Sequence, residues 1–221
     1  MSTETAKAPI KRRSKGEQTR NQILNAAIEV LASQGIKGTT HRAIATHADI
    51  QLSLTTYYFK DIQELVHEAF MLSSTKTVSK AGAAWIQAFK LLDAYPKAQL
   101  KKTAIKTELA TLLCEMATQY LVNKIITSPI DLTIEQLLFT EIQVTPQLRE
   151  LAHHHRNALL APFVRLCSYF NKSTAETDAD IMLTLFTQLE YRNLMNPSNQ
   201  IDIKTIEQTV KRIIHWIMQI K

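Results

Sequence analysis

The stretch Thr39–Tyr58, TTHRAIATHADIQLSLTTYY, decides the fold that we predict for this chain. Either of the threonines that open it can cap a helix, because a threonine oxygen accepts a hydrogen bond from a free N–H of the first turn. Ile44, Ala45 and Ala48 then recur at helical spacing on one face. Asp49 interrupts this pattern, and a second short helical segment follows. Two short helices joined by a tight turn are typical of the unit that places its second helix in the major groove of DNA.

Residues in and around this unit also resemble a known family. They are Gly35, Lys37–Thr40, Arg42–Ala45, Ala48, Ile50 and Thr56–Lys60. In this pattern, roughly from Glu17 to Phe70, the chain resembles the DNA-binding region of the tetracycline-repressor (TetR) family. It departs from that family at Asp49, where Gly is usual, and at Thr55, where many members carry a buried Leu. Asp tolerates a left-handed backbone better than most residues do, so we expect the turn to form.

The resemblance implies an all-α architecture of nine helices, in which an N-terminal three-helix head containing the helix-turn-helix precedes a C-terminal helical body. We accordingly predict a disordered basic arm over 1–13, a helix-turn-helix DNA-binding domain over 14–60 and an effector-binding and dimerisation domain over 61–221. Ser14 and Glu17 have the spacing of a capping box, so the first helix should start near them. The basic cluster Lys11–Arg13 could reach into the minor groove or simply attract DNA without specificity.

The predicted DNA contacts lie at the start of the first short helix and on, or directly after, the second. They are Arg42, Leu52, Ser53, Thr56, Tyr57, Tyr58 and Lys60. Leu52 and Ser53 stand at the helix tip, where side chains meet base edges, although Leu52 can offer only an apolar contact. Arg42 resembles the family position that contacts a base or a phosphate, and Thr56, Tyr57 and Tyr58 resemble positions that hold the DNA backbone. Lys60 can pair with a phosphate, whereas either Tyr58 or Phe59 could fill the core instead.

The charge distribution agrees with a head that contacts phosphates. Residues 1–60 hold nine Lys and Arg against four acidic residues, out of a formal net charge of +6 for the whole chain. A basic head on a nearly neutral body is typical of a protein that binds nucleic acid at one end. The chain has no apolar run of membrane-spanning length and no secretory signal, so we expect a cytoplasmic protein without a membrane partner.

No residue pattern favours an enzyme, a cofactor or a metal site. The sequence has neither a Gly-rich phosphate loop nor a nucleophile beside a base, and Glu108, Glu115 and Glu141 could face a cavity without forming an acid–base pair. The consecutive histidines 153–155 point about 100° apart on a helix and cannot chelate one ion together. One of them could line a cavity. We predict a non-enzymatic protein with no metal and no cofactor.

The body should contain a ligand cavity, as the resemblance implies. Its expected lining is Trp85, Phe89, Met116, Tyr120, Phe139 and Phe186, each of which could equally be plain core. The segments 175–195 and 201–220 carry apolar residues on more than one side, which is typical of helices buried between neighbours. The resemblance implies that they form a four-helix bundle with a second copy, and a monomeric core is the alternative.

These observations predict a ligand-responsive repressor that binds a pseudo-palindromic DNA operator as a homodimer. A small, mostly apolar effector would release it. Two alternatives remain open at this point. The chain could be a ligand-independent DNA-binding factor or an activator, or it could be a helical protein-interaction module whose head no longer binds DNA.

Overall fold

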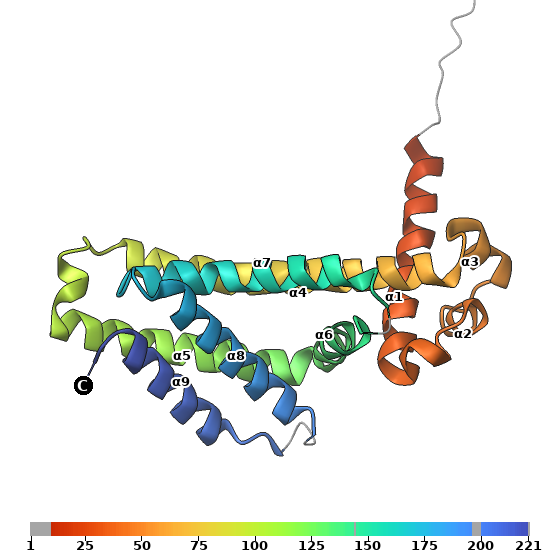
Figure 1. Ribbon diagram of the computed structural model, residues 1–221. Helices are drawn as coiled ribbons and strands as arrows, with labels where there is room; N and C mark the ends of the chain where they lie inside the picture. The colour runs from red at the N-terminus through yellow and green to blue at the C-terminus, as the bar shows by residue number, and fades with distance from the viewer. Residues whose placement is uncertain (1–9, 144, 196–199, 221) are drawn as a thin grey trace, which may run out of the picture. The chain divides into compact units, whose positions relative to one another are not determined.

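The structure is a computed structural model that describes residues 10–143, 145–195 and 200–220, with side chains from Lys15 onward. Its described elements are all helical, as the sequence predicts, and no strand occurs among these residues. The elements are α1 (Ile10–Gly38), α2 (His41–His47), α3 (Leu52–Tyr58), α4 (Ile62–Asp93), η1 (Gln99–Lys101), α5 (Thr103–Thr127), α6 (Pro129–Glu141), α7 (Leu148–Ser168), α8 (Ala175–Asn193) and α9 (Ile203–Ile217). Figure 1 shows them in chain order.

The chain divides into two compact units, Met1–Ser73 (unit 1) and Ser74–Lys221 (unit 2). The division falls inside α4, thirteen residues after the expected boundary at 60/61. The first helix begins at Ile10, so the described end of the predicted arm is helical, and its first nine residues lie outside the described part. Gly35 interrupts the helical path near the end of α1 with a left-handed φ of 66°, which glycine adopts without steric cost.

A small apolar core holds unit 1 together. Its fully or almost fully buried members are Ile23, Leu24, Ala27, Ile28, Leu31, Ile44, Phe59 and Leu65. They come from α1, α2, α4 and the residue that directly follows α3. Ala48, which shares the helical spacing of Ile44 and Ala45, is only half-buried because it stands at the C-terminal cap of α2.

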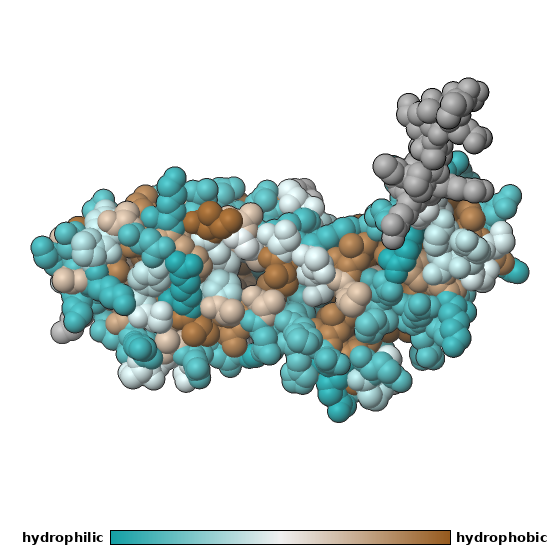
Figure 2. All heavy atoms as spheres, turned by 90° about the horizontal axis from the view of Figure 1, so that it is seen from above, coloured by the Kyte–Doolittle hydropathy of each residue, from teal (hydrophilic) through white to brown (hydrophobic). Residues whose placement is uncertain are grey.

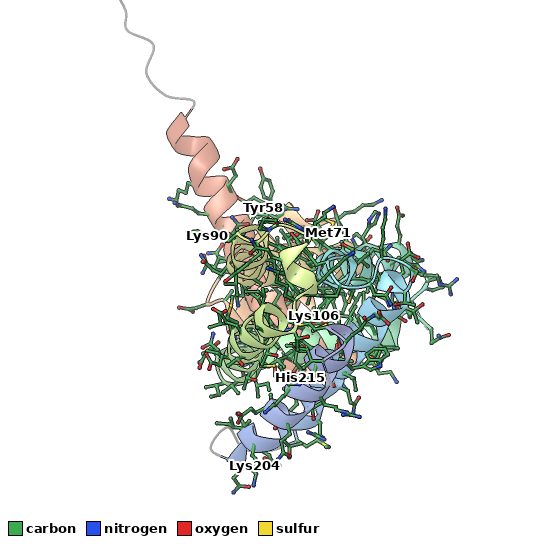
Figure 3. The ribbon with its side chains drawn as sticks, turned by 90° about the vertical axis from the view of Figure 1, so that its left-hand side faces the viewer. Tyr58, Met71, Lys90, Lys106, Lys204 and His215 are labelled. Atoms are coloured by element: carbon green, nitrogen blue, oxygen red, sulfur yellow. The ribbon has the colours of Figure 1, made fainter. Side chains whose placement is uncertain are left out.

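Unit 2 is a bundle built around α5. The helix α5 contacts α6, α8 and α9, while α7 packs along α8. The helix α9 contacts α8 and runs antiparallel to it (Figure 1). Figure 3 shows Lys204 and His215 at the two ends of α9.

Unit 2 also exposes several large apolar side chains. The surface drawn in Figure 2 is mostly hydrophilic, with hydrophobic residues between the hydrophilic ones. The large apolar side chains of unit 2 that are exposed to solvent are Ile86, Leu112, Ile126, Ile130, Ile181, Met195, Ile203 and Trp216. Single exposed apolar residues are normal on proteins, so only those that gather on one face need an explanation. No helix within the described ranges has both the length and the apolar character needed to cross a bilayer.

Candidate functional site

The turn between α2 and α3 sets the direction of α3. The Thr40 hydroxyl caps α2 by accepting a hydrogen bond from the Ala43 N–H at 3.1 Å. At the other end of α2, Asp49 adopts a left-handed φ of 52°, so the departure from glycine is accommodated. The Gln22 side chain of α1 donates to the Ala48 carbonyl at 3.0 Å and ties the turn to the first helix. The two short helices therefore have a defined geometry.

The helix α3 has one buried side and one exposed side. Thr55 and, directly after the helix, Phe59 are completely buried. The exposed side, which we call the α3 face, consists of Leu52, Ser53, Thr56 and Tyr57. Tyr57 has 80% of its surface exposed, which is unusual for an aromatic side chain without a partner to cover it.

Thr55 shows how this helix accommodates a second departure from the family. Its hydroxyl donates to the Leu52 carbonyl at 2.8 Å, one turn back along the helix. A buried hydroxyl therefore has a hydrogen-bond partner, and the polar group does not destabilise the core as an unpaired one would.

Three predicted contacts flank the α3 face. Arg42 and Lys60 are exposed, and Tyr58 is half-buried with its ring edge-on to Tyr57 at a centroid distance of 5.1 Å. Of the two residues that could fill the core, it is Phe59 that does so. The Arg20 guanidinium lies 5.1 Å from the centre of the Phe59 ring and pairs with Glu68 at 2.6 Å, so this basic residue is engaged within unit 1.

The α3 face has the composition of a surface that contacts DNA. Hydroxyl groups and a tyrosine can donate to phosphate oxygens, and an apolar tip can contact a thymine methyl group. Residues 23–69, which contain this whole arrangement, match the family model for bacterial regulatory proteins of the tetR family. The head is a TetR-family domain. The resemblance seen in the sequence is therefore confirmed for this part of the chain.

Solved structures extend the likeness to the fold of nearly the whole chain. A protein of Mesorhizobium loti MAFF303099 described as a TetR-family transcriptional regulator has a TM-score of 0.68 at 15% identity, covering 93% of this chain and 98% of its own. A transcriptional regulator of Rhodococcus sp. RHA1 also has a TM-score of 0.68, at 13% identity over 90% of this chain and 96% of its own. The multidrug binding protein EbrR in complex with imidazole has a TM-score of 0.54 at 20% identity, with coverages of 88% and 93%. Among curated proteins, none matches this chain.

The second site is a cavity of about 90 Å³ inside unit 2. Helices α4, α5, α6, α7, α8 and α9 all contribute to its wall. Most of the lining is apolar, as the sequence predicts. Four of the predicted residues line it: Trp85, Met116, Tyr120 and Phe186.

The other two predicted lining residues lie elsewhere in unit 2. Phe89 is buried one helical turn after Trp85, where its ring stacks on Trp85 and lies 3.9 Å below the Arg165 guanidinium. Phe139 is half-buried, and its ring centre is 6.0 Å from that of His155. Aromatic content alone did not separate cavity residues from core residues, because both occupy buried helix faces.

The polar end of the cavity was not predicted from the sequence. Lys124, Glu135 and Glu190 line it, and together with His155 they form what we call the buried charge cluster. The Lys124 Nζ lies 2.7 Å from Glu190 Oε2 and 3.5 Å from Glu135 Oε2. His155 Nε2 is 3.3 Å from Glu135 Oε1, while its Nδ1 is 2.8 Å from the Ser74 hydroxyl. Each residue comes from a different helix.

Burial and mutual attraction set the protonation of this cluster. Burial alone would lower the pKa of Lys124, but the charges of Glu190 and Glu135 outweigh it and raise that pKa, so the ammonium keeps its proton. Burial also favours the neutral form of Glu135, yet contacts with His155 and Lys124 hold its pKa below the ordinary value. At Glu190, burial dominates and raises the pKa to about 7.

The other residues weighed as chemical sites are unremarkable in the structure. His153 and His154 are exposed, and only His155 is buried. No group of three or more potential metal ligands occurs within the described ranges. Cys114 and Cys167 are buried free thiols, and burial raises the pKa of Cys114 to about 11. Glu108, Glu115 and Glu141, considered as cavity carboxylates, do not line the cavity.

Proposed function

We propose that this chain is a cytoplasmic transcription repressor, which binds a pseudo-palindromic DNA operator as a homodimer and is released by a small effector in the cavity of unit 2. The observation that carries the proposal is the α3 face. Its hydroxyls and the Tyr57 ring are exposed, while Thr55 and Phe59 hold the other side of the same helix in the core. Such an amphipathic short helix after a tight turn fits the major groove.

Phosphate contacts should supply much of the affinity, because α3 itself carries no charged residue. The exposed cations Arg42 and Lys60 stand on either side of it in the sequence. We expect Tyr57→Ala to weaken binding to operator and to random duplex DNA alike, by about 1.5–3 kcal/mol, because the lost contact is a hydrogen bond to a charged phosphate. Electrophoretic mobility shifts on both duplexes measure this. Tyr57→Phe removes only the hydroxyl, so it separates the hydrogen bond from the contacts of the ring. Operator affinity that is unchanged in Tyr57→Ala would contradict the phosphate role.

Arg42 tests base reading instead of backbone binding. We expect Arg42→Ala to cost about 1–3 kcal/mol on the operator and to relax the preference at one base position, provided that the guanidinium contacts a base edge. Binding to a set of operators with single base changes gives the preference at each position. A uniform loss across the set would instead assign Arg42 to a phosphate.

The homodimer is proposed from the outer side of the last two helices. Ile181 and Trp216 are exposed, at 40% and 51%, and a shallow groove beside Trp216 is lined also by Leu185, Gln208 and Arg212. We call these five residues the α8–α9 face. An exposed Trp and an Arg around an apolar centre are the residue types that dominate interface energies. A two-fold axis through such a face would match the symmetry of a pseudo-palindrome.

We expect Trp216→Glu to weaken the dimer by about 2 kcal/mol or more, since it places a charge in the centre of the interface. Sedimentation velocity over a dilution series measures the dimer dissociation. Ile86→Glu on α4 is the matched control, because Ile86 is 65% exposed and lies off the α8–α9 face. An equal effect of both variants, or a monomeric wild type, would contradict the proposed interface.

Release by an effector requires different affinities of that effector for two conformations of the protein. The cavity, with its apolar wall and polar end, supports the effector part of the proposal. The competing function is a DNA-binding factor without an effector. Fractionated metabolite extract added to the operator complex distinguishes them, because only the effector-responsive protein then releases DNA.

A further inference from the structure

The cavity of unit 2 joins an apolar, aromatic wall to a buried group of charges. We propose that it binds a small organic cation with an apolar, partly aromatic body. The inference rests on the effector role proposed above and names the chemistry of that effector.

The aromatic wall suits a cation as well as an apolar body. The Trp85 and Phe163 ring centres are 4.8 Å apart at an interplanar angle of 80°, and Phe163 and Phe186 are 5.4 Å apart at 88°. Perpendicular rings present faces in different directions, and an aromatic face attracts a cation through its quadrupole. Met116 and Leu183 complete this part of the lining with flexible apolar side chains.

Two carboxyl groups and one cation line the polar end of the cavity, and His155, which contacts Glu135 Oε1, is not among the lining residues. Glu135 and Glu190, which are 5% and 4% exposed, face a single lysine, Lys124. Glu135 Oε2 has no hydrogen-bond partner among the described residues, although Lys124 Nζ is 3.5 Å away. A buried carboxylate with an unfilled acceptor position is costly. A ligand cation would compensate the charge, and a cation that carries an N–H would also supply the missing hydrogen bond.

The same geometry argues against an anionic ligand. Lys124 is the only basic residue among those that line the cavity, and its ammonium already contacts both carboxylates. An anion at this end would meet two carboxylates and could gain the lysine only by breaking those contacts. A neutral ligand would leave the excess negative charge uncompensated.

The titratable groups around Glu190 make cation binding depend on pH. Lys124 from α5 and Glu135 from α6 act on its pKa. Tyr120 from α5 and Tyr191 from its own helix lie close enough to respond to its charge, and His155 from α7 contacts Glu135. Helices α4 and α9 add only uncharged lining here. Because burial raises the pKa of Glu190 to about 7, this carboxyl is largely protonated at pH 6 and largely ionised at pH 8. Ionised Glu190 favours a cation, so affinity should rise with pH, by about tenfold from pH 6 to pH 8.

Isothermal titration calorimetry of the full chain without DNA tests the proposal. The probes are benzyltrimethylammonium, whose charge does not titrate, its neutral isostere neopentylbenzene, and the anion phenylacetate. We expect the cation to bind at least about tenfold more tightly than either other probe at pH 8 and to lose about tenfold in affinity at pH 6. Quenching of Trp85 fluorescence, absent in Trp85→Phe, places the probe in the cavity.

Glu190→Gln keeps the shape of the side chain and removes the excess charge. We expect it to weaken cation binding about tenfold at pH 8 and to remove the dependence on pH, while neopentylbenzene binds unchanged. Glu176→Gln, on an exposed position of the same helix, is the matched control, and circular dichroism checks that both variants fold.

Three results would overturn the proposal. The first is a cation that binds no more tightly than neopentylbenzene, which includes no binding of either. The others are tighter cation binding at pH 6 than at pH 8, and wild-type cation affinity in Glu190→Gln. Since these titrations contain no DNA, their failure is separate from failure of the proposed repressor function. A protein that binds its operator but prefers neopentylbenzene or phenylacetate would keep the DNA-binding role and lose only the cationic effector.

Discussion

Replacement of Lys124 by methionine is expected to destabilise unit 2 by about 3–5 kcal/mol at pH 8, because it leaves two carboxylates buried without their shared cation. Glu135 and Glu190 are both at most 5% exposed, so water cannot take over the role of the lysine. Methionine keeps most of the length of the side chain and fills most of the space next to the apolar lining, so the measured loss reports chiefly the missing charge.

The destabilisation should depend on pH in a definite direction. Without Lys124, burial would raise the pKa of both carboxyls in the folded state above the unfolded value. The folded chain would then hold protons that the unfolded chain releases, so stability would fall as the pH rises through that interval. We therefore expect a smaller loss at pH 5 than at pH 8.

Urea unfolding followed by tryptophan fluorescence measures this loss. Trp85 and Trp216 are the only two tryptophans of the chain, and both belong to unit 2. Lys90→Met, at an exposed position of α4, is the matched control and should change stability by less than about 0.5 kcal/mol. A loss below about 1 kcal/mol at pH 8, or one that grows toward pH 5, would show that Lys124 does not hold the cluster together.

Phe59→Ala is expected to cost unit 1 about 3–5 kcal/mol, the usual range for emptying a buried phenylalanine site. Phe59 is completely buried directly after α3, and the Arg20 guanidinium lies over one face of its ring. Loss of the ring removes the anchor that keeps the α3 face turned outward. DNA binding should therefore weaken together with stability.

Amide hydrogen exchange followed by mass spectrometry measures this effect separately in α1–α3 and in unit 2. We expect faster exchange in α1–α3 alone. Phe59→Leu, which retains most of the volume, should cost less than about 1.5 kcal/mol and keep DNA binding. Equal exchange protection in Phe59→Ala and the wild type would mean that the ring does not support the head.

The sequence predicted unit 1 in detail because its signals are local. Thr40 caps α2, and Asp49 adopts the left-handed conformation at the turn. One side of α3 is buried and the other is exposed. Each of these features depends on neighbours within one or two turns. The start of α1 at Ile10 differs from the prediction because the capping spacing at Ser14 lies within a longer helix.

The cavity was predictable only in part because it is assembled from six helices far apart in the sequence. Trp85, Met116, Tyr120 and Phe186 were found from their side-chain type, but the same criterion also selected Phe89 and Phe139. The charge cluster was missed because a lone Lys or Glu on a helix is usually solvated. One signal was present: Glu190 continues the buried stripe of Met182 and Phe186 at a spacing of four residues.

The central claim is that the α3 faces of two copies of this chain contact one DNA operator together. Selection from a library of randomised DNA duplexes by the purified full-length protein tests this claim most directly. We predict enrichment of an inverted repeat whose half-sites are centred about one helical turn, 34–36 Å, apart or a multiple of it. The enrichment should be lost in Tyr57→Ala and in Trp216→Glu. Recovery of no sequence preference, or of an asymmetric single site bound equally well by Trp216→Glu, would contradict the account.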